Sequence, residues 1–120
     1  AYEIRLSLVG SEMCIRDSLY SGAFAFLYTS LRESFGIPLL EAMACGTPVV
    51  TSNTSSMPEV GGPGALLCDP TDAKDIAHKI LSLEKDPALY RQQIQYGLRR
   101  AKRFSWETTA TELLSIYKSI

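Results

Sequence analysis

The sequence predicts an α/β fold in which helices flank a parallel sheet. Residues 24–28 are a short apolar, aromatic-rich run of the kind that a buried parallel strand shows. Residues 48–51 resume as a second apolar strand, and a loop and a helix lie between the two runs. In a parallel sheet this order puts the loop and the start of the helix at the carboxyl edge, where ligands of open α/β sheets bind.

The predicted helix begins near Pro38. Gly36 permits backbone conformations barred to other residues and lets a ligand approach the main chain, while Pro38 has no amide hydrogen to leave unpaired at a helix start. Leucine, alanine and methionine follow as good helix formers, and Gly46 with Pro48 beyond it ends the helix. The positive dipole end of such a helix suits a phosphate or pyrophosphate group.

Three elements are expected next along the chain. Residues 57–60 form a helical turn, and residues 65–68 form a last short strand. Asp72 caps a helix that runs through Leu83 and carries an apolar stripe of isoleucine and leucine. His78 lies off that stripe, so we expect it to be exposed and without a catalytic role.

Two further helices are expected at the C-terminal end. Pro87 starts a helix to about Arg103, and Ser105 caps the last one, which we expect Trp106 to anchor. That last helix has an apolar face, and such a face left exposed would mark a missing partner.

Two glutamates lie on either side of the Gly36 turn. Glu33 is in the loop, and Glu41 is one turn into the helix. Ionised carboxylates only accept hydrogen bonds, so sugar hydroxyls suit Glu33 and a ribose diol suits Glu41. The alternative is that Glu41 complements the helix dipole while Glu33 is a solvated loop charge. The spacing of a bare pair favours that alternative, because charged helix starts are common.

The longer stretch around this pair is more specific. Residues 33–50 read Glu-Ser-Phe-Gly-Ile-Pro-Leu-Leu-Glu-Ala-Met-Ala-Cys-Gly-Thr-Pro-Val-Val. This stretch resembles the signature of the retaining, nucleotide-sugar-dependent glycosyltransferases of GT-B architecture, the "glycosyl transferases group 1". The resemblance runs from about Leu19 to the C-terminus. It implies a partial Rossmann-like parallel sheet with flanking helices, the second half of the C-terminal, donor-binding domain of that architecture.

The resemblance also implies a function, namely hexosyl transfer with retention from a nucleoside diphosphate sugar to a glycan, lipid or small acceptor. It assigns the transferred sugar to Glu33, the nucleotide ribose to Glu41, and backbone contacts with sugar and diphosphate to Phe35, Gly36 and Ile37. We expect no catalytic residue, cofactor or metal here, because helix dipole and basic side chains can take the charge of the leaving diphosphate.

The polar loop at residues 51–59 is a second candidate part of the site. It follows the carboxyl end of a strand, so Ser52 or Thr54 could hydrogen-bond the nucleotide. An ordinary turn accounts for the loop equally well. The loop looks most like those of mannosyl- and related hexosyltransferases of bacterial polysaccharide assembly.

Length limits the activity expected of the chain. Its 120 residues are the size of one small domain and far short of the two domains that such an enzyme needs. We therefore expect a fragment that is inactive alone. Its partners would be the nucleotide sugar and the N-terminal acceptor domain of the same parent chain.

The first eighteen residues are treated separately. Residues 1–18 could form a strand and the start of a helix. However, residues 7–18 resemble a recurrent translation of sequencing-adapter read-through rather than the family. We expect residues 1–18 not to be native to the gene and residues 19–120 to be the donor-domain part, and we assign no function to Glu12, Cys14 or Arg16.

Charge and cysteine content give weaker bounds. Twelve Lys and Arg against thirteen Asp and Glu leave a net charge of −1 and offer no overall basic surface for nucleic acid. A C-terminal basic cluster is expected to be a solvated face, with contact to anionic lipid as the alternative; it comprises Arg91, Arg99, Arg100, Lys102 and Arg103. Three cysteines without metal-ligand spacing indicate reduced thiols.

No apolar run is long enough to span a membrane and no signal peptide is recognisable. We therefore expect a cytoplasmic protein, with peripheral contact at the inner face of the membrane as an alternative. Two functions other than transfer stay open. One is a non-catalytic module that binds nucleotide sugars, and the other is a helical interaction domain.

Overall fold

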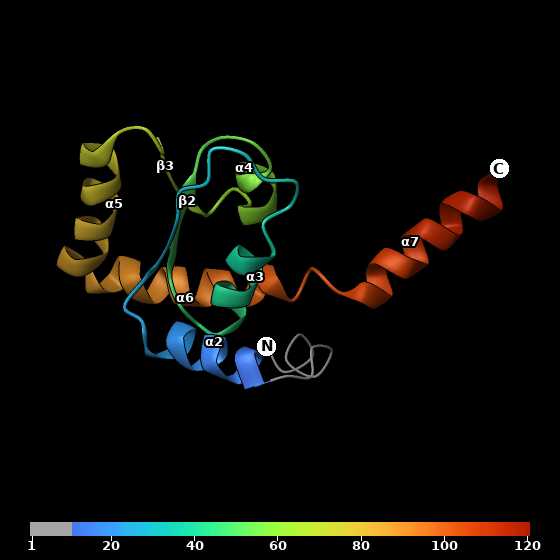
Figure 1. Cartoon of the computed structure of the whole chain (residues 1–120), viewed down its shortest axis with the longest axis horizontal. Coiled ribbons are helices and arrows are strands. Elements are labelled where there is room, and N and C mark those ends of the chain that lie inside the picture. The colour runs from blue at the N-terminus through green and yellow to red at the C-terminus, as the bar shows by residue number, and fades with distance from the viewer. Residues whose placement is uncertain (1–10) are drawn as a thin grey trace.

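The computed structural model describes residues 11–120 and has the expected α/β architecture. Its sheet has three parallel strands in the order β1 (Phe26–Tyr28), β2 (Val49–Ser52) and β3 (Leu66–Cys68). Tyr28 pairs with Thr51, and Ser52 pairs with Cys68, so the three strands end at the same edge (Figure 1). The strand expected within residues 1–10 lies outside the described residues.

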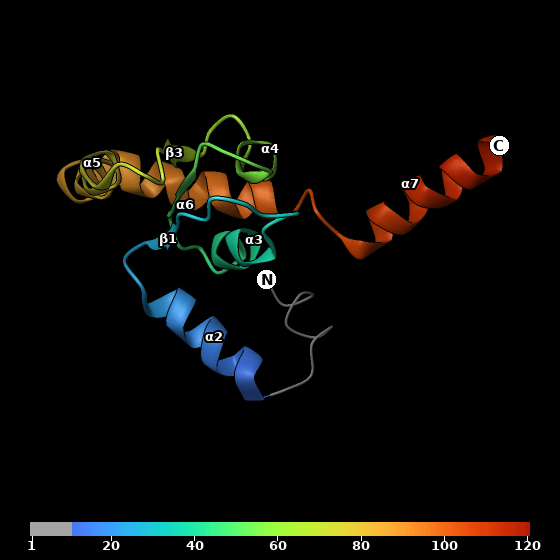
Figure 2. The same cartoon turned by 45° about the horizontal axis from the view of Figure 1, so that its top comes forward.

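Helices connect the strands and cover the sheet (Figures 1 and 2). Their bounds are α2 Ser11–Gly22, α3 Ile37–Ala44, α4 Met57–Gly61, α5 Ala73–Lys85, α6 Pro87–Ala101 and α7 Trp106–Ser119. α3 joins β1 to β2 and α4 joins β2 to β3, as parallel pairing requires a crossover between strands. No described helix is both long and apolar enough to cross a membrane.

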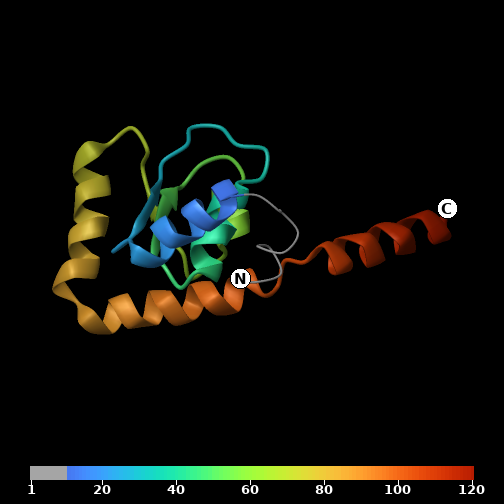
Figure 3. The same ribbon diagram turned by 60° about the horizontal axis from the view of Figure 1, so that its bottom comes forward.

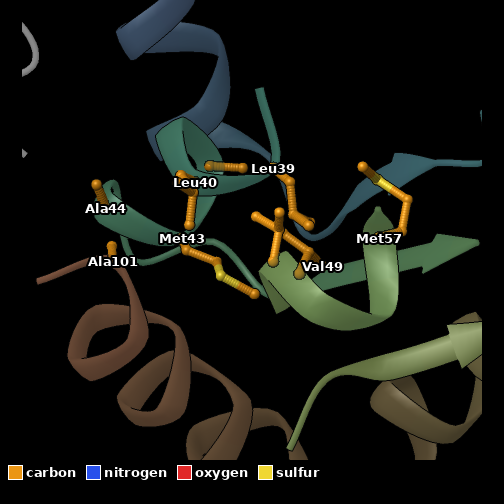
Figure 4. Packing of buried hydrophobic residues seen from close by; sticks show 9 residues of the cluster. Leu39, Leu40, Met43, Ala44, Val49, Met57 and Ala101 are labelled. Atoms are coloured by element: carbon orange, nitrogen blue, oxygen red, sulfur yellow. The ribbon is translucent and has the colours of Figure 1, made fainter. Parts of the chain in front are cut away.

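The core divides at the central strand, β2. Successive strand residues point to opposite faces, so Val49 packs with Leu39 and Met43 of α3 and with Met57 of α4 (Figure 4). Val50 packs on the other face with Cys68 and with Leu83 of α5. The predicted α5 stripe is confirmed, because Ile76 and Ile80 adjoin this second cluster. Helices on both faces thus fix the position of β2 and of the loops at its ends.

Side-chain caps set the starts of the later helices as expected. Asp72 accepts hydrogen bonds from the backbone amides of Lys74 and Asp75, and Ser105 accepts from that of Thr108. Asp86 caps α6 in the same way, directly before Pro87. Each cap satisfies amides that a helix start leaves without a partner.

Two expectations about the strands and the last helix are wrong. β1 begins at Phe26 rather than at residue 24, and it is not fully buried, because Leu27 is 44% exposed. Trp106 does not anchor α7: it is 73% exposed, and α7 has no buried residue. α7 extends away from the rest of the described chain (Figures 1 and 3), which leaves Trp106 without a surface to pack on.

The C-terminal basic cluster is only partly a solvated face. Arg91, Arg99, Lys102 and Arg103 are exposed, as expected, but Arg100 is half-buried. Its Nε donates to the carbonyl oxygen of Val60 at 3.0 Å, and its Nη2 donates to that of Glu59 at 2.6 Å. The interpretation of Arg100 as a solvated charge is therefore wrong, because its guanidinium donates hydrogen bonds to backbone carbonyl oxygens at the end of α4.

Candidate functional site

Two loops meet at the carboxyl edge of the sheet, one after β1 and one after β2. Hydroxyls of β2 donate hydrogen bonds to the end of β1 and to the loop that follows it. Thr51 Oγ1 donates to the carbonyl oxygen of Tyr28 at 2.9 Å, and Ser52 Oγ donates to that of Ser30 at 2.5 Å. The expected coincidence of the two loops at one edge is confirmed. We refer to residues 33–36 as the Glu33 loop.

Two serines of the second loop hold the backbone of the Glu33 loop. Ser55 Oγ accepts from the amide of Glu33 at 3.0 Å and donates to its carbonyl oxygen at 2.7 Å. Ser56 Oγ donates to the carbonyl oxygens of Glu33 at 3.2 Å and of Phe35 at 3.0 Å. Ser55 has a φ of 59°, an uncommon conformation for a residue other than glycine. A backbone outlier at this point favours a functional constraint on the loop.

Gly36 ends the Glu33 loop and precedes α3. Its φ of 96° and ψ of 51° are left-handed, and a Cβ there would overlap the terminal methyl of Met57 and lie 3.2 Å from the Met57 sulfur. Met57 is fully buried, so it has little room to yield. Pro38 lies in the first turn of α3, as predicted. Gly36 is itself buried, so its left-handed backbone and its packing against Met57 are what require glycine at the mouth of α3.

The Glu33 carboxylate is oriented by Tyr28, whose hydroxyl donates to Glu33 Oε1. Burial, and next the hydrogen bond to Glu33, raise the pKa of Tyr28 to about 12. Tyr28 therefore keeps its proton and remains a donor at neutral pH. Since a carboxylate offers about four acceptor positions, Glu33 keeps capacity for the hydroxyls of a ligand.

Glu41 is buried between α3 and α2, with an exposed fraction of 4%. Its Oε2 accepts hydrogen bonds from Arg16 Nη2 and from the Tyr20 hydroxyl, the latter at 3.2 Å. α3 has no acidic residue in its first turn, so the alternative of Glu41 as a simple dipole complement is wrong. The boundary proposed at residues 18 and 19 falls inside α2, and the origin of residues 1–18 stays a prediction.

The other predicted contact residues differ in accessibility. Phe35 and Ile37 are exposed beside Gly36, and Thr54 is exposed in the second loop. Ser52 has no exposed surface and uses its hydroxyl within the protein. Within residues 11–120, no three His, Cys, Asp or Glu side chains gather as metal ligands would.

Sequence reasoning missed three residues that shape this site, namely Tyr28, Ser55 and Ser56. Tyr28 orients the Glu33 side chain, and the two serines fix its backbone. The available signal was position: Tyr28 ends one strand and the serines follow the next, so parallel pairing brings them together. Nothing in the residue types alone distinguished them from core and turn residues.

The parallel sheet has helices on both faces and an oriented carboxylate at its carboxyl edge, which is the edge where open α/β domains bind ligands. Comparison with known families identifies which family of such domains this is. The sequence profile described as "Glycosyl transferases group 1" matches residues 16–100. The chain belongs to this glycosyltransferase family, and the resemblance seen in its sequence is confirmed.

Individual relatives agree with that assignment. The chain is 45% identical over 100 residues to "O-antigen chain mannosyltransferase B" of Escherichia coli, an alignment that covers 83% of this chain and 26% of the relative. It is 36% identical over 132 aligned positions to "D-inositol 3-phosphate glycosyltransferase" of Corynebacterium jeikeium. That alignment covers 97% of this chain and 32% of the relative. The chain thus spans about a quarter to a third of the length of these curated relatives.

A solved structure gives the same picture for the fold. Sucrose-phosphate synthase from Thermosynechococcus elongatus superposes with a TM-score of 0.74 at 35% sequence identity. The match covers 83% of this chain and 26% of that one. The parallel sheet with its flanking helices is therefore shared with part of that larger protein.

Proposed function

We propose that this chain binds the nucleoside diphosphate sugar donor of a hexosyltransferase that works with retention on a glycan, lipid or small acceptor. The observation that carries the proposal is the site at the mouth of α3, where the Tyr28 hydroxyl orients the Glu33 carboxylate close to the start of the helix. Family membership supports it. Because relatives named as mannosyltransferases match this chain, mannose is the first hexose to test.

The roles follow from the chemistry of each group. Glu33 accepts hydrogen bonds from hydroxyls of the transferred sugar, with Tyr28 fixing one of its oxygens. The main chain of Phe35, Gly36 and Ile37 lies against sugar and diphosphate, and the positive end of α3 faces the phosphate charge. Charge stabilisation of this kind needs no metal, and we assign no nucleophile.

Glu41 holds the nucleotide ribose in this proposal, which requires access to a buried carboxylate. The Arg16 side chain that covers it is 44% exposed, and a ribose diol would replace it as the hydrogen-bond donor to the Glu41 carboxylate. If residues 1–18 are not native to the gene, Arg16 is an incidental cover. Removing Arg16 should then leave donor binding intact or strengthen it.

The second loop supplies the remaining nucleotide contacts. Thr54 is exposed at the carboxyl edge and offers a hydroxyl to the nucleotide. Ser52 stays a predicted contact, but it would have to release the Ser30 carbonyl to serve as a donor.

The parent protein supplies the acceptor side in this proposal. α7 exposes an apolar face of Leu113, Leu114, Ile116 and Tyr117, and we propose that the N-terminal acceptor domain of the same parent chain covers it. This chain alone would then bind donor without transferring sugar.

The site acts in the cytoplasm, and the exposed basic residues of α6 allow peripheral contact with anionic lipid at the inner membrane face.

The test is calorimetric titration of nucleoside diphosphate mannose and glucose into the chain and into Glu33→Ala and Glu41→Ala, with turnover measured in the full-length gene product. We expect each variant to bind donor about 10- to 100-fold more weakly, since a hydrogen bond to a charged group contributes about 1.5–3 kcal/mol. Glu84→Ala, an exposed carboxylate on α5, is the matched control. Unchanged binding and turnover in both site variants would overturn the assignment. Binding without turnover in the intact gene product would favour the non-catalytic module instead.

A further inference from the structure

Side chains of α6 donate hydrogen bonds to the backbone carbonyl oxygens at the C-terminal end of α4. Arg100 donates to the carbonyls of Glu59 and Val60, and the Tyr96 hydroxyl donates to that of Gly61 at 2.7 Å. A helix leaves its last carbonyls without partners, and a cation is favourable at that end. Gly62 makes the approach feasible, because a Cβ there would lie 2.7 Å from Arg100 Nε. α4 is thus fixed from its C-terminal end by α6.

The guanidinium of Arg100 also lies over the ring of Phe104, with 5.1 Å from Cζ to the ring centroid. Phe104 follows α6 and packs partly against the main core cluster. Its other contact is with Phe35, whose ring it meets edge to face at a centroid distance of 5.9 Å and an angle of 79°. This is a favoured geometry for an aromatic pair.

Two routes therefore connect Arg100 to the Glu33 loop. One runs through the rings, from Arg100 to Phe104 to Phe35. The other runs through α4, whose preceding residue, Ser56, donates to the carbonyl oxygen of Phe35. The ring route fixes the side chain of Phe35 and the α4 route fixes its backbone. Phe35 is 41% exposed, so burial by its surroundings does little to hold it.

We propose that Arg100 and Phe104 are positioning residues that hold Phe35, and with it the Glu33 loop, in the geometry that receives the donor sugar. That the Glu33 loop receives the donor sugar rests on the function proposed above. That Arg100 and Phe104 hold this loop in place does not depend on that function. Neither residue touches the ligand in this arrangement. Their loss should therefore weaken binding of the sugar and diphosphate parts of the donor more than binding of its nucleoside part.

The test compares binding of guanosine diphosphate mannose and uridine diphosphate glucose with binding of the two nucleoside monophosphates, which lack both the sugar and the second phosphate. Arg100→Ala and Phe104→Leu should bind the sugar-bearing ligand about 3- to 10-fold more weakly, the range that one aromatic contact provides. The sugar-free nucleotide should change less than about twofold. Arg99→Ala is the matched control, since Arg99 is an exposed arginine on the same helix. Phe104→Tyr keeps the ring and should bind as the unaltered chain does.

A second readout needs no ligand. Amide hydrogen exchange at Glu33 and Gly36 should quicken in Arg100→Ala and Phe104→Leu but not in Arg99→Ala. If the unaltered chain binds no nucleotide sugar, the proposed function fails while this exchange still decides the positioning role. Unchanged exchange in both variants, or equal losses of sugar-bearing and sugar-free ligands, would overturn the inference. Arg100→Lys should fold and recover part of the effect, because lysine keeps the charge but lacks the planar fork that reaches two carbonyls.

Discussion

Replacing Gly36 by alanine should destabilise the fold as well as the site. The left-handed backbone at Gly36 costs a residue with a Cβ about 1–2 kcal/mol. The added methyl also overlaps the end of Met57, which is fully buried, and overpacking of this kind costs about 1–3 kcal/mol. The sum is a loss of about 2–5 kcal/mol, equivalent to a fall in melting temperature of roughly 8–20 °C for a domain of this size.

The measurement is urea unfolding of Gly36→Ala beside a matched glycine variant. Gly22 is exposed at the end of α2, and a Cβ there would meet nothing within 4 Å. Gly22→Ala should therefore change the free energy of unfolding by less than about 0.5 kcal/mol. In a Met57→Ala background the overlap disappears, so Gly36→Ala should then cost only its backbone part, about 1–2 kcal/mol.

Two results would refute this reasoning. A Gly36→Ala variant as stable as Gly22→Ala would show that the backbone at the mouth of α3 tolerates a side chain. An equal cost of Gly36→Ala with and without the Met57 side chain would show that the predicted overlap is absent.

Four further changes test other parts of the structure. Tyr28 has a folded pKa of about 12 against an ordinary value of 10.0, so its contribution to stability is full below pH 10 and is lost as the pH rises toward 12. Ultraviolet absorbance titration of the unaltered chain, compared with that of Tyr28→Phe, should show the ionisation of Tyr28 at this raised pKa. Glu33→Gln should lower the pKa of Tyr28. A Tyr28 pKa near 10 in the unaltered chain would contradict the burial of its hydroxyl. Leu83→Ala should cost about 2–5 kcal/mol in urea unfolding, because Leu83 is 1% exposed. Trp106→Ala should cost under about 0.5 kcal/mol, and a larger loss would mean that α7 packs on the rest of the chain. Asp72→Ala should cost about 1 kcal/mol through its lost cap, and no change would exclude a stabilising role for the two hydrogen bonds that it accepts.

Much of the fold could be predicted because its signals are local. The start of α3 follows from Gly36 and Pro38, and the start of α5 follows from the Asp72 cap, each decided by residues a few positions apart. The parallel order of the strands follows from the helices between them. The exposure of Trp106 could not be predicted in this way, since an apolar residue packs only where another element lies within reach.

In the candidate site, too, some features follow from residues close together in the sequence and others depend on tertiary contacts. The Glu33 loop and its place at the carboxyl edge follow from the order of strand, loop and helix. The state of Glu41 does not, because its partners lie on α2: Tyr20 is 21 residues away and Arg16 is 25. The family resemblance marked Glu41 as a ligand-holding residue, and the structure adds that its carboxylate is covered.

Taken alone, the sequence determined the order of the elements, the parallel arrangement of the strands, the family and the glycine turn at Gly36. Each of these depends on neighbours in the chain, whose geometry is fixed by backbone sterics and capping. The tertiary structure decided that Tyr28 orients Glu33, that Ser55 and Ser56 hold its loop, and that Arg100 joins α6 to that loop through Phe104. These contacts join segments remote in sequence, so they exist only once packing has brought the two faces of the sheet and its carboxyl edge into place.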